Sequence, residues 1–238
     1  MDLRRLSLLP EPLKKVFLEG IDPLADGLIK AGLSPNRITT LSVLVIIASG
    51  AAYALGALHL GGALLLSSGI FDLLDGKVAR RANLASKFGA FYDSSMDRLG
   101  EGALFTGIAI FYMTSTIKDW GQHKPVLALG LCFACLTGSF LVSYTRARAE
   151  GLGYSASVGM ATRAERIVFL GVPTLFFGSG PGGYLLLGIL AFLTLISWIT
   201  VVQRIAFVYH ASQAELNEPP VPRTTVAGPI ADPVGKGI

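Results

Sequence analysis

Four aspartates, Asp72, Asp75, Asp93 and Asp97, stand close together in a chain of 238 residues that is 52% hydrophobic and only 15% charged. Placing one carboxylate at the depth of a bilayer costs about 2.5–3.5 kcal/mol on insertion scales, so four of them need positive partners. Carboxylate oxygens are ligands for hard cations, and no histidine or cysteine accompanies them. The cluster therefore predicts a site for Mg²⁺, Mn²⁺ or Ca²⁺, and two divalent ions would balance the four carboxylates.

The spacing of these aspartates suits one face on each of two helices. The first face combines two aspartates with small residues and one arginine: Asp72, Asp75, Gly76, Ala79 and Arg80. The second is a stripe with a residue at every fourth position: Gly89, Asp93 and Asp97. Because the connection between the two segments is short, we expect antiparallel neighbouring helices whose stripes face each other, so that the four carboxylates converge. The small residues leave room for a diphosphate, and Arg80 offers it a partner.

The same residues carry a resemblance to a known family. From Asp72 to Asp97 the pattern Asp-x2-Asp-Gly-x2-Ala-Arg-x8-Gly-x3-Asp-x3-Asp matches, at every fixed position, the signature of the CDP-alcohol phosphotransferases. The segment LSPNRITTLS resembles that family's entry to its first membrane helix. The resemblance implies an all-α integral membrane enzyme of six transmembrane helices, usually a homodimer. Such an enzyme transfers a phosphatidyl-type group from a CDP-linked lipid, such as CDP-diacylglycerol, to an alcohol and releases CMP.

The resemblance also implies roles for individual residues. It implies that Asp72, Asp75 and Asp93 hold two Mg²⁺ or Mn²⁺ ions, and that Asp97 both contributes to the metal site and acts as the general base. It implies a binding site for the CDP-lipid made of seven residues: Pro35, Asn36, Thr39, Gly76, Ala79, Arg80 and Gly89.

A second group of cations stands in the stretch SYTRARAEGLGYSASVGMATRAERIVFL. These arginines could be topology determinants that reach lipid headgroups, or they could bind a phosphate on the acceptor alcohol, which a guanidinium matches with two parallel hydrogen bonds. SYTRARAE and TRAER resemble segments of the phosphatidylinositol-phosphate synthases of the family. That resemblance implies a site for inositol phosphate formed by Ser143, Arg146, Arg148, Arg163 and Arg166. Glycerol 3-phosphate, giving phosphatidylglycerophosphate, is the alternative acceptor. Thr162 stands where the resemblance leads us to expect an acidic residue.

Six apolar segments can position these residues: 38–58, 59–80, 87–112, 125–149, 165–177 and 184–209. With a mean hydropathy of +0.58, they predict an all-α bundle of six transmembrane helices over residues 35–212. Residues 1–34 interleave leucines with basic residues and predict an amphipathic juxtamembrane segment. Residues 213–238 are rich in proline and predict a disordered cytoplasmic tail. The CxxC pair, Cys132 and Cys135, fits helix packing better than a redox or zinc site.

The distribution of lysine and arginine predicts the orientation. The loops expected on the outer side carry only Lys118 and Lys124, whereas the other basic residues fall at or near the opposite ends of the segments. The positive-inside rule then places both termini and the active site on the cytoplasmic side of the cell membrane. We expect membrane lipids as surroundings and no nucleic-acid partner.

The same residues could also belong to two other classes of membrane protein. A divalent-cation transporter would explain the carboxylates, but it would not explain Gly76, Arg80 or the arginines between Arg146 and Arg166. A non-catalytic membrane scaffold would leave four aspartates at membrane depth as an uncompensated cost. The sequence therefore favours the transferase.

Overall fold

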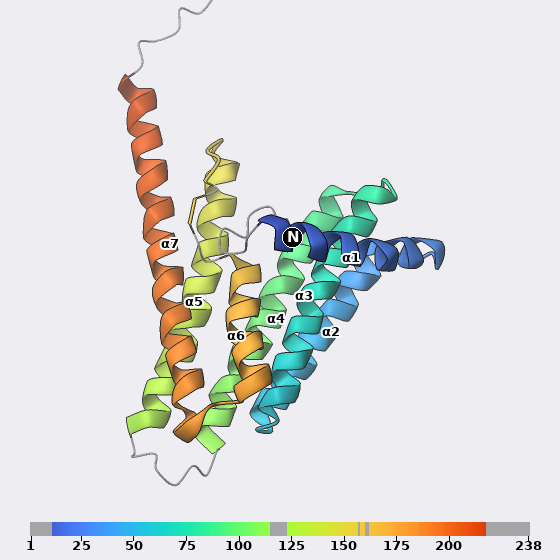
Figure 1. Cartoon of the computed structure of the whole chain (residues 1–238). Helices are drawn as coiled ribbons and strands as arrows, with labels where there is room; N and C mark the ends of the chain where they lie inside the picture. Colours follow the sequence, from blue (N-terminus) through green and yellow to red (C-terminus); the bar gives the residue numbers. More distant parts are fainter. Residues whose placement is uncertain (1–10, 115–122, 157, 160–161, 218–238) are drawn as a thin grey trace, which may run out of the picture.

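The chain is helical throughout the part that the structure describes (Figure 1). The computed structural model describes residues 11–114, 123–156, 158–159 and 162–217, without the side chains of 11–19, 123 and 124. The elements follow in chain order: α1 (Glu11–Lys30), α2 (Pro35–Ala54), α3 (Leu58–Arg81), α4 (Lys87–Thr114), α5 (His123–Gly151), α6 (Arg163–Phe177), a 3₁₀ turn (Pro181–Gly183) and α7 (Tyr184–Asn217). The expected all-α fold class is confirmed for these ranges.

Each of the six apolar segments corresponds to one helix, from α2 to α7. Helix α2 ends at Ala54, before the predicted end at residue 58, because Gly56 adopts a left-handed φ of +77° that terminates it. Helix α7 continues to Asn217, so the boundary predicted between residues 212 and 213 falls inside a helix. The tail from residue 218 and the leucine-rich first 19 side chains lie outside the described residues.

Four helices are long and apolar enough to cross a membrane: α2, α3, α5 and, with its preceding 3₁₀ turn, α7. Helix α6 has only 15 residues. Helix α4 has 28 residues but carries Asp93, Asp97, Arg98 and Glu101 in its first half. The protein is therefore an all-helical membrane bundle in which the charged residues are concentrated on particular helices.

Helix α2 packs against both α3 and α4. Gly107 on α4 permits this approach, since a Cβ there would lie 1.9 Å from the carbonyl oxygen of Gly50 on α2. A Cβ on Gly100 would lie 2.5 Å from a side-chain methyl carbon of Ile46. The prediction that the two aspartate helices pack directly on each other is therefore wrong. Within the described helices α3 and α4 make almost no mutual contact, because the glycine face of α4 is taken up by α2.

Helix α1 lies across the end of the bundle and packs against α3 (Figure 1). Its residues Ile21 and Ala25 are buried in a cluster with apolar residues of α3. Asp22 forms ion pairs with Lys77 and with Arg81, the latter at 2.8 Å. The connection between α5 and α6 and the C-terminal end of α7 lie at the same end of the bundle, so the segments that carry the predicted site gather there.

Candidate active site

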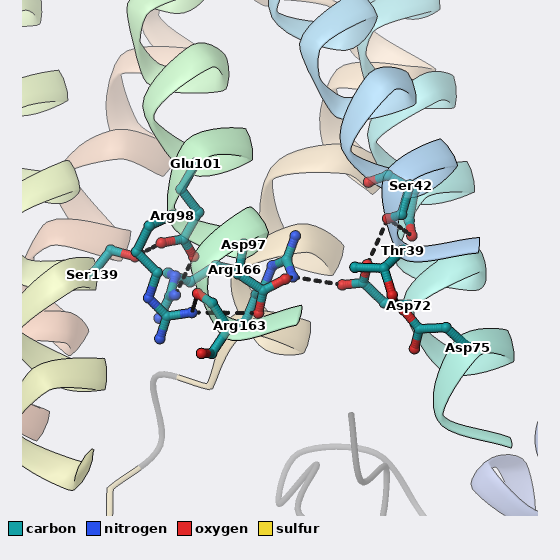
Figure 2. A network of polar contacts seen from close by, with 12 residues as sticks. Thr39, Ser42, Asp72, Asp75, Asp97, Arg98, Glu101, Ser139, Arg163 and Arg166 are labelled. Carbon is teal, nitrogen blue, oxygen red and sulfur yellow. Dashed lines mark hydrogen bonds and ion pairs between the residues drawn. The ribbon is translucent and has the colours of Figure 1, made fainter. Parts of the chain in front are cut away.

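Two hydroxyl groups on α2 hold two of the aspartates on α3 (Figure 2). Thr39 donates to Asp75 Oδ2 at 2.7 Å, and Ser42 donates to Asp72 Oδ1 at 2.5 Å. The helices are antiparallel, so three residues forward on α2 match three residues back on α3. Both aspartates are buried, and the hydrogen bonds offset part of the cost of removing their charges from water.

A cavity of about 210 Å³ opens between α3, α4 and the start of α2. Asp75 and Asp93 lie in its wall. The connection between α3 and α4 forms one side: Asn83 ends α3 with a φ of +54°, and the hydroxyl of Ser86 accepts a hydrogen bond from the backbone N–H of Gly89 at 3.0 Å. Because α3 and α4 have few direct contacts with each other, space is left between their ends for a ligand.

All seven residues predicted to bind the CDP-lipid line this cavity: Pro35, Asn36, Thr39, Gly76, Ala79, Arg80 and Gly89. Arg80 is exposed, so its guanidinium can meet a charged ligand. The structure thus brings the seven together from two helices and the first turn of a third, while their role in binding stays a prediction.

Arg163 joins an aspartate of α3 to one of α4 (Figure 2). Its Nη1 lies 2.7 Å from Asp72 Oδ2 and also contacts Asp97. The start of α6 is fixed by a capping box, in which the Thr162 hydroxyl accepts from the backbone N–H of Glu165. The Glu165 carboxylate in turn accepts from the N–H of Thr162 at 2.8 Å. Thr162, found where an acidic residue was expected, is therefore the N-cap that places Arg163 in the first turn of α6.

A second polar group lies deeper in the bundle (Figure 2). Glu101 pairs with Arg166 and accepts a hydrogen bond from Ser139 at 2.5 Å, and all three side chains are buried. A buried carboxylate and guanidinium compensate each other's charge. Arg166, predicted to bind the acceptor, is thus held by Glu101. Arg98 lies closer to the aspartates, 3.4 Å from Asp97.

The remaining predicted acceptor residues lie on the last turns of α5. Arg146 pairs with Glu150 at 2.8 Å on the surface of that helix. Arg148 is exposed, and Ser143 is half-buried. Of the predicted acceptor set, the structure places Arg163 directly against the aspartates and leaves Arg146 and Arg148 at the end of α5.

The segment between α5 and α6 is attached to α7. The buried Arg204 donates through Nε to the carbonyl oxygen of Val158 at 3.0 Å and also contacts the carbonyl oxygen of Val142. Gly159 has a φ of +107°, and a Cβ there would lie 2.2 Å from a side-chain carbon of Thr200. Helix α7 therefore fixes the segment that leads into α6 and to Arg163.

The chemistry of the four aspartates fits hard divalent cations, since they supply only carboxylate oxygens. The charges on Asp72 and Asp93 both repel that on Asp75, so the three share one electrostatic environment. The predicted convergence of all four is nevertheless not found. Among the described residues no three acidic, histidine or cysteine side chains form a group that could hold a metal ion. Arg163 instead lies between Asp72 and Asp97 and pairs with both.

Sequence reasoning missed three residues that support the site. Ser42 lies three residues after Thr39, and Asp72 lies three residues before Asp75. On antiparallel helices these equal spacings allow two hydroxyl–carboxylate pairs, so the spacing could have revealed Ser42. Glu101 lies four residues after Asp97 and so continues the spacing of the acidic residues on α4, which could have revealed it. Arg204 carries no such signal, because it is one of several basic residues that the positive-inside rule already explains.

Comparisons with known proteins cover most of this chain, including the helices α2 to α6. A model of the family described as CDP-alcohol phosphatidyltransferase matches residues 32–209. Archaetidylinositol phosphate synthase of Methanothermobacter thermautotrophicus is 38% identical over 202 residues, which cover 83% of this chain and 92% of that protein. Phosphatidylinositol phosphate synthase of Streptomyces avermitilis is 32% identical over 213 residues, which cover 87% of this chain and 84% of that protein.

A solved structure has the same fold. The crystal structure of Mycobacterium tuberculosis phosphatidylinositol phosphate synthase with CDP-DAG bound superimposes with a TM-score of 0.66 at 31% identity, covering 79% of this chain and 92% of that chain. The same enzyme is also known in complex with manganese and citrate, at the same TM-score. The matched span contains every residue of the predicted site. With the signature, the cavity and these relatives in agreement, the chain belongs to the CDP-alcohol phosphatidyltransferase family, the membrane transferases of phospholipid synthesis.

Proposed function

We propose that this protein transfers a phosphatidyl-type group from a CDP-linked lipid to a hydroxyl of inositol phosphate and releases CMP. One observation carries the proposal: the cavity that gathers all seven predicted nucleotide residues has Asp75 and Asp93 in its wall. A nucleotide bound there would present its diphosphate to the carboxylates, and Arg163 lies beside them. The product would be phosphatidylinositol phosphate.

The donor site suits a nucleotide linked to a lipid. Arg80 supplies a cation for a phosphate, and Gly76 and Gly89 let the ligand approach the backbone. The Mycobacterium tuberculosis enzyme binds CDP-DAG, which supports CDP-diacylglycerol as the donor. An ether-linked archaeal donor is the alternative, in keeping with the archaetidylinositol phosphate synthase among the relatives.

The four aspartates would hold two Mg²⁺ or Mn²⁺ ions; the manganese-bound relative supports this choice. When bound, such ions neutralise the diphosphate and stabilise CMP as a leaving group. Asp97 would act as the general base and take the proton of the attacking hydroxyl onto its carboxylate. Because Asp97 is largely shielded from solvent, few water molecules could compete with the acceptor as nucleophile.

The acceptor would be bound through its phosphate by arginines. Arg163 is the closest to the reacting groups, Arg166 lies behind it in the pair with Glu101, and Ser143, Arg146 and Arg148 would complete the site from α5. Inositol phosphate is favoured over glycerol 3-phosphate because the relatives are inositol phosphate synthases. A free alcohol such as choline carries no phosphate for these arginines to bind.

The enzyme would work at the cytoplasmic face of the cell membrane. In this arrangement all six helices from α2 to α7 span the bilayer, both termini are cytoplasmic, and α1 lies along the surface as an amphipathic helix. The charged half of α4 would be tolerated because Asp97 pairs with Arg163 and Glu101 pairs with Arg166. We expect a homodimer.

Parallel assays of one purified preparation would test the proposal. The protein, with CDP-diacylglycerol and Mg²⁺, is given inositol phosphate, glycerol 3-phosphate, free inositol or serine, and the lipid products are identified by mass. We expect a product with inositol phosphate. Product from glycerol 3-phosphate alone would overturn the acceptor, and no product with any of them would overturn the reaction. Mg²⁺ flux into liposomes without transfer would instead indicate the cation transporter.

A further inference from the structure

Arg163 occupies a position between two carboxylates that belong to different helices. Its Nη1 lies 2.7 Å from Asp72 Oδ2 and contacts Asp97, and its side chain is only 14% exposed. Figure 2 shows the guanidinium between the α2–α3 group on one side and the α4 group on the other. The same guanidinium also attracts the charge of Asp93. It is therefore the main cation of the aspartate cluster in this arrangement, with Arg98 at 3.4 Å from Asp97 as the next.

A guanidinium in this place and a divalent ion on the same carboxylates exclude each other. Both need the lone pairs of Asp72 and Asp97, and two like charges at contact distance repel strongly in a site shielded from water. The pairing is also incomplete, since Arg163 Nε is buried without a hydrogen-bond partner among the described residues. A buried donor without a partner favours any rearrangement that satisfies it, and a phosphate can accept two parallel hydrogen bonds from one guanidinium.

We infer that Arg163 is an exchangeable counter-ion: it neutralises Asp72 and Asp97 until divalent ions displace it, and the displaced guanidinium then binds the phosphate of the acceptor. The inference rests on the proposed function and adds an order of binding to it, in which metal binds before the acceptor. Binding of metal completes the acceptor site, because Arg163 must leave the aspartates before it can bind the acceptor phosphate.

Thermodynamic linkage makes the exchange measurable without turnover. If Arg163 competes with metal, removing its charge must tighten metal binding, typically by roughly 5- to 150-fold for coupled sites. Mn²⁺ affinity is measured by electron paramagnetic resonance on the intact protein, its Arg163→Gln variant and its Arg163→Lys variant. We expect tighter binding in Arg163→Gln and an intermediate effect in Arg163→Lys, which keeps the charge but loses the planar fork.

The matched control is Arg81→Gln. It removes one positive charge near the same end of the bundle, but the partners of Arg81 are Asp22 and Asp26 on α1. Its Mn²⁺ affinity should equal that of the unchanged protein. Unchanged or weaker Mn²⁺ binding in Arg163→Gln, or equal tightening in Arg81→Gln, would overturn the exchange. The reaction itself could still proceed, so this failure is distinct from failure of the proposed function.

A second measurement uses the unchanged protein and so does not depend on how a variant folds. Phenylglyoxal modifies accessible arginines, and peptide mapping follows Arg163 separately, with Arg81 as internal reference. We expect Mg²⁺ to accelerate the modification of Arg163, and inorganic phosphate to protect it only when Mg²⁺ is present. Modification that Mg²⁺ leaves unchanged or slows, or protection by phosphate without Mg²⁺, would contradict the inference.

Discussion

Individual side chains share the stabilisation of the site aspartates. Asp72 and Asp75 each accept a hydrogen bond from a hydroxyl of α2, and Asp97 is held by cations instead. A hydroxyl donor leaves the net charge of a carboxylate in place, whereas a guanidinium neutralises it. Asp75 is therefore held by a hydroxyl, Asp97 by cations, and Asp72 by both a hydroxyl and the guanidinium of Arg163.

Replacing Asp97 by asparagine tests the assignment of the base. The amide has nearly the same shape but accepts no proton, so turnover should fall by about 100- to 10,000-fold while CDP-lipid binding is retained. CMP release and equilibrium binding of CDP-diacylglycerol, measured on the same preparation, separate the two effects. Full turnover in Asp97→Asn would exclude this residue as the base.

The aspartates and the cavity residues could be found from sequence because both follow from spacing along single helices. Their pairing with these partners was not predicted, since Thr39 and Ser42 reach the aspartates from another helix, and Arg163 does so from α6. Long-range pairs depend on how helices pack. Arg166 illustrates the limit: its charge was visible in the sequence, but its burial against Glu101 was not.

At the level of helices, the position of α2 decides the shape of the site. The glycines of α2 and α4 allow these two helices to approach closely, whereas α3 and α4 have few direct contacts. The short connection after α3 suggested direct neighbours, but a short loop fixes only the distance between two helix ends. The gap between α3 and α4 contains the cavity that we propose as the nucleotide site.

Gly107→Ala tests this contact. The added methyl would meet the backbone of Gly50, which cannot move aside without shifting a helix, so we expect destabilisation of about 1–3 kcal/mol. Gly102→Ala is the control on the same helix, because its Cβ would have no neighbour within 4 Å, and alanine is the better helix former. Thermal unfolding in detergent should show a lower midpoint for Gly107→Ala alone. Equal midpoints would argue against close packing of α2 on α4.

The docking of α1 should depend on pH. The hydrogen bond from Lys77, with the charge of Arg81, holds the pKa of the Asp22 carboxyl below its ordinary value of 3.8. A carboxyl with a lowered folded pKa stabilises the docked helix above about pH 3.8 and loses this contribution as the pH falls through the folded value. Hydrogen exchange in α1, corrected for its intrinsic rate, should therefore rise at pH values below 3.8.

The variants of this helix separate its two ion pairs. Asp22→Asn should show faster exchange already at neutral pH, with little further rise in acid. Asp26→Asn leaves the Lys77 contact in place and should have a smaller effect. If hydrogen exchange in α1 changes neither with the substitutions nor with pH, the ion pairs do not hold the helix. The apolar burial of Ile21 and Ala25 would then be sufficient to hold it.

For the whole molecule, hydrophobic segments predicted the helices well because burial in a bilayer demands long apolar runs. The arrangement of α2 to α7 required the structure, since it depends on small residues that act in pairs on different helices. Helix α7 illustrates both points: its apolar part was evident, but its buried Arg204, which holds the segment before α6, was hidden among the basic residues of one face.

The central claim is that the aspartate cluster performs a metal-dependent transfer from a CDP-linked lipid. The most direct test is the release of CMP from CDP-diacylglycerol with inositol phosphate, after a chelator and after restoration of Mg²⁺ or Mn²⁺. The account predicts no release with the chelator and recovery with either ion. Undiminished release of CMP in the chelated protein would contradict it.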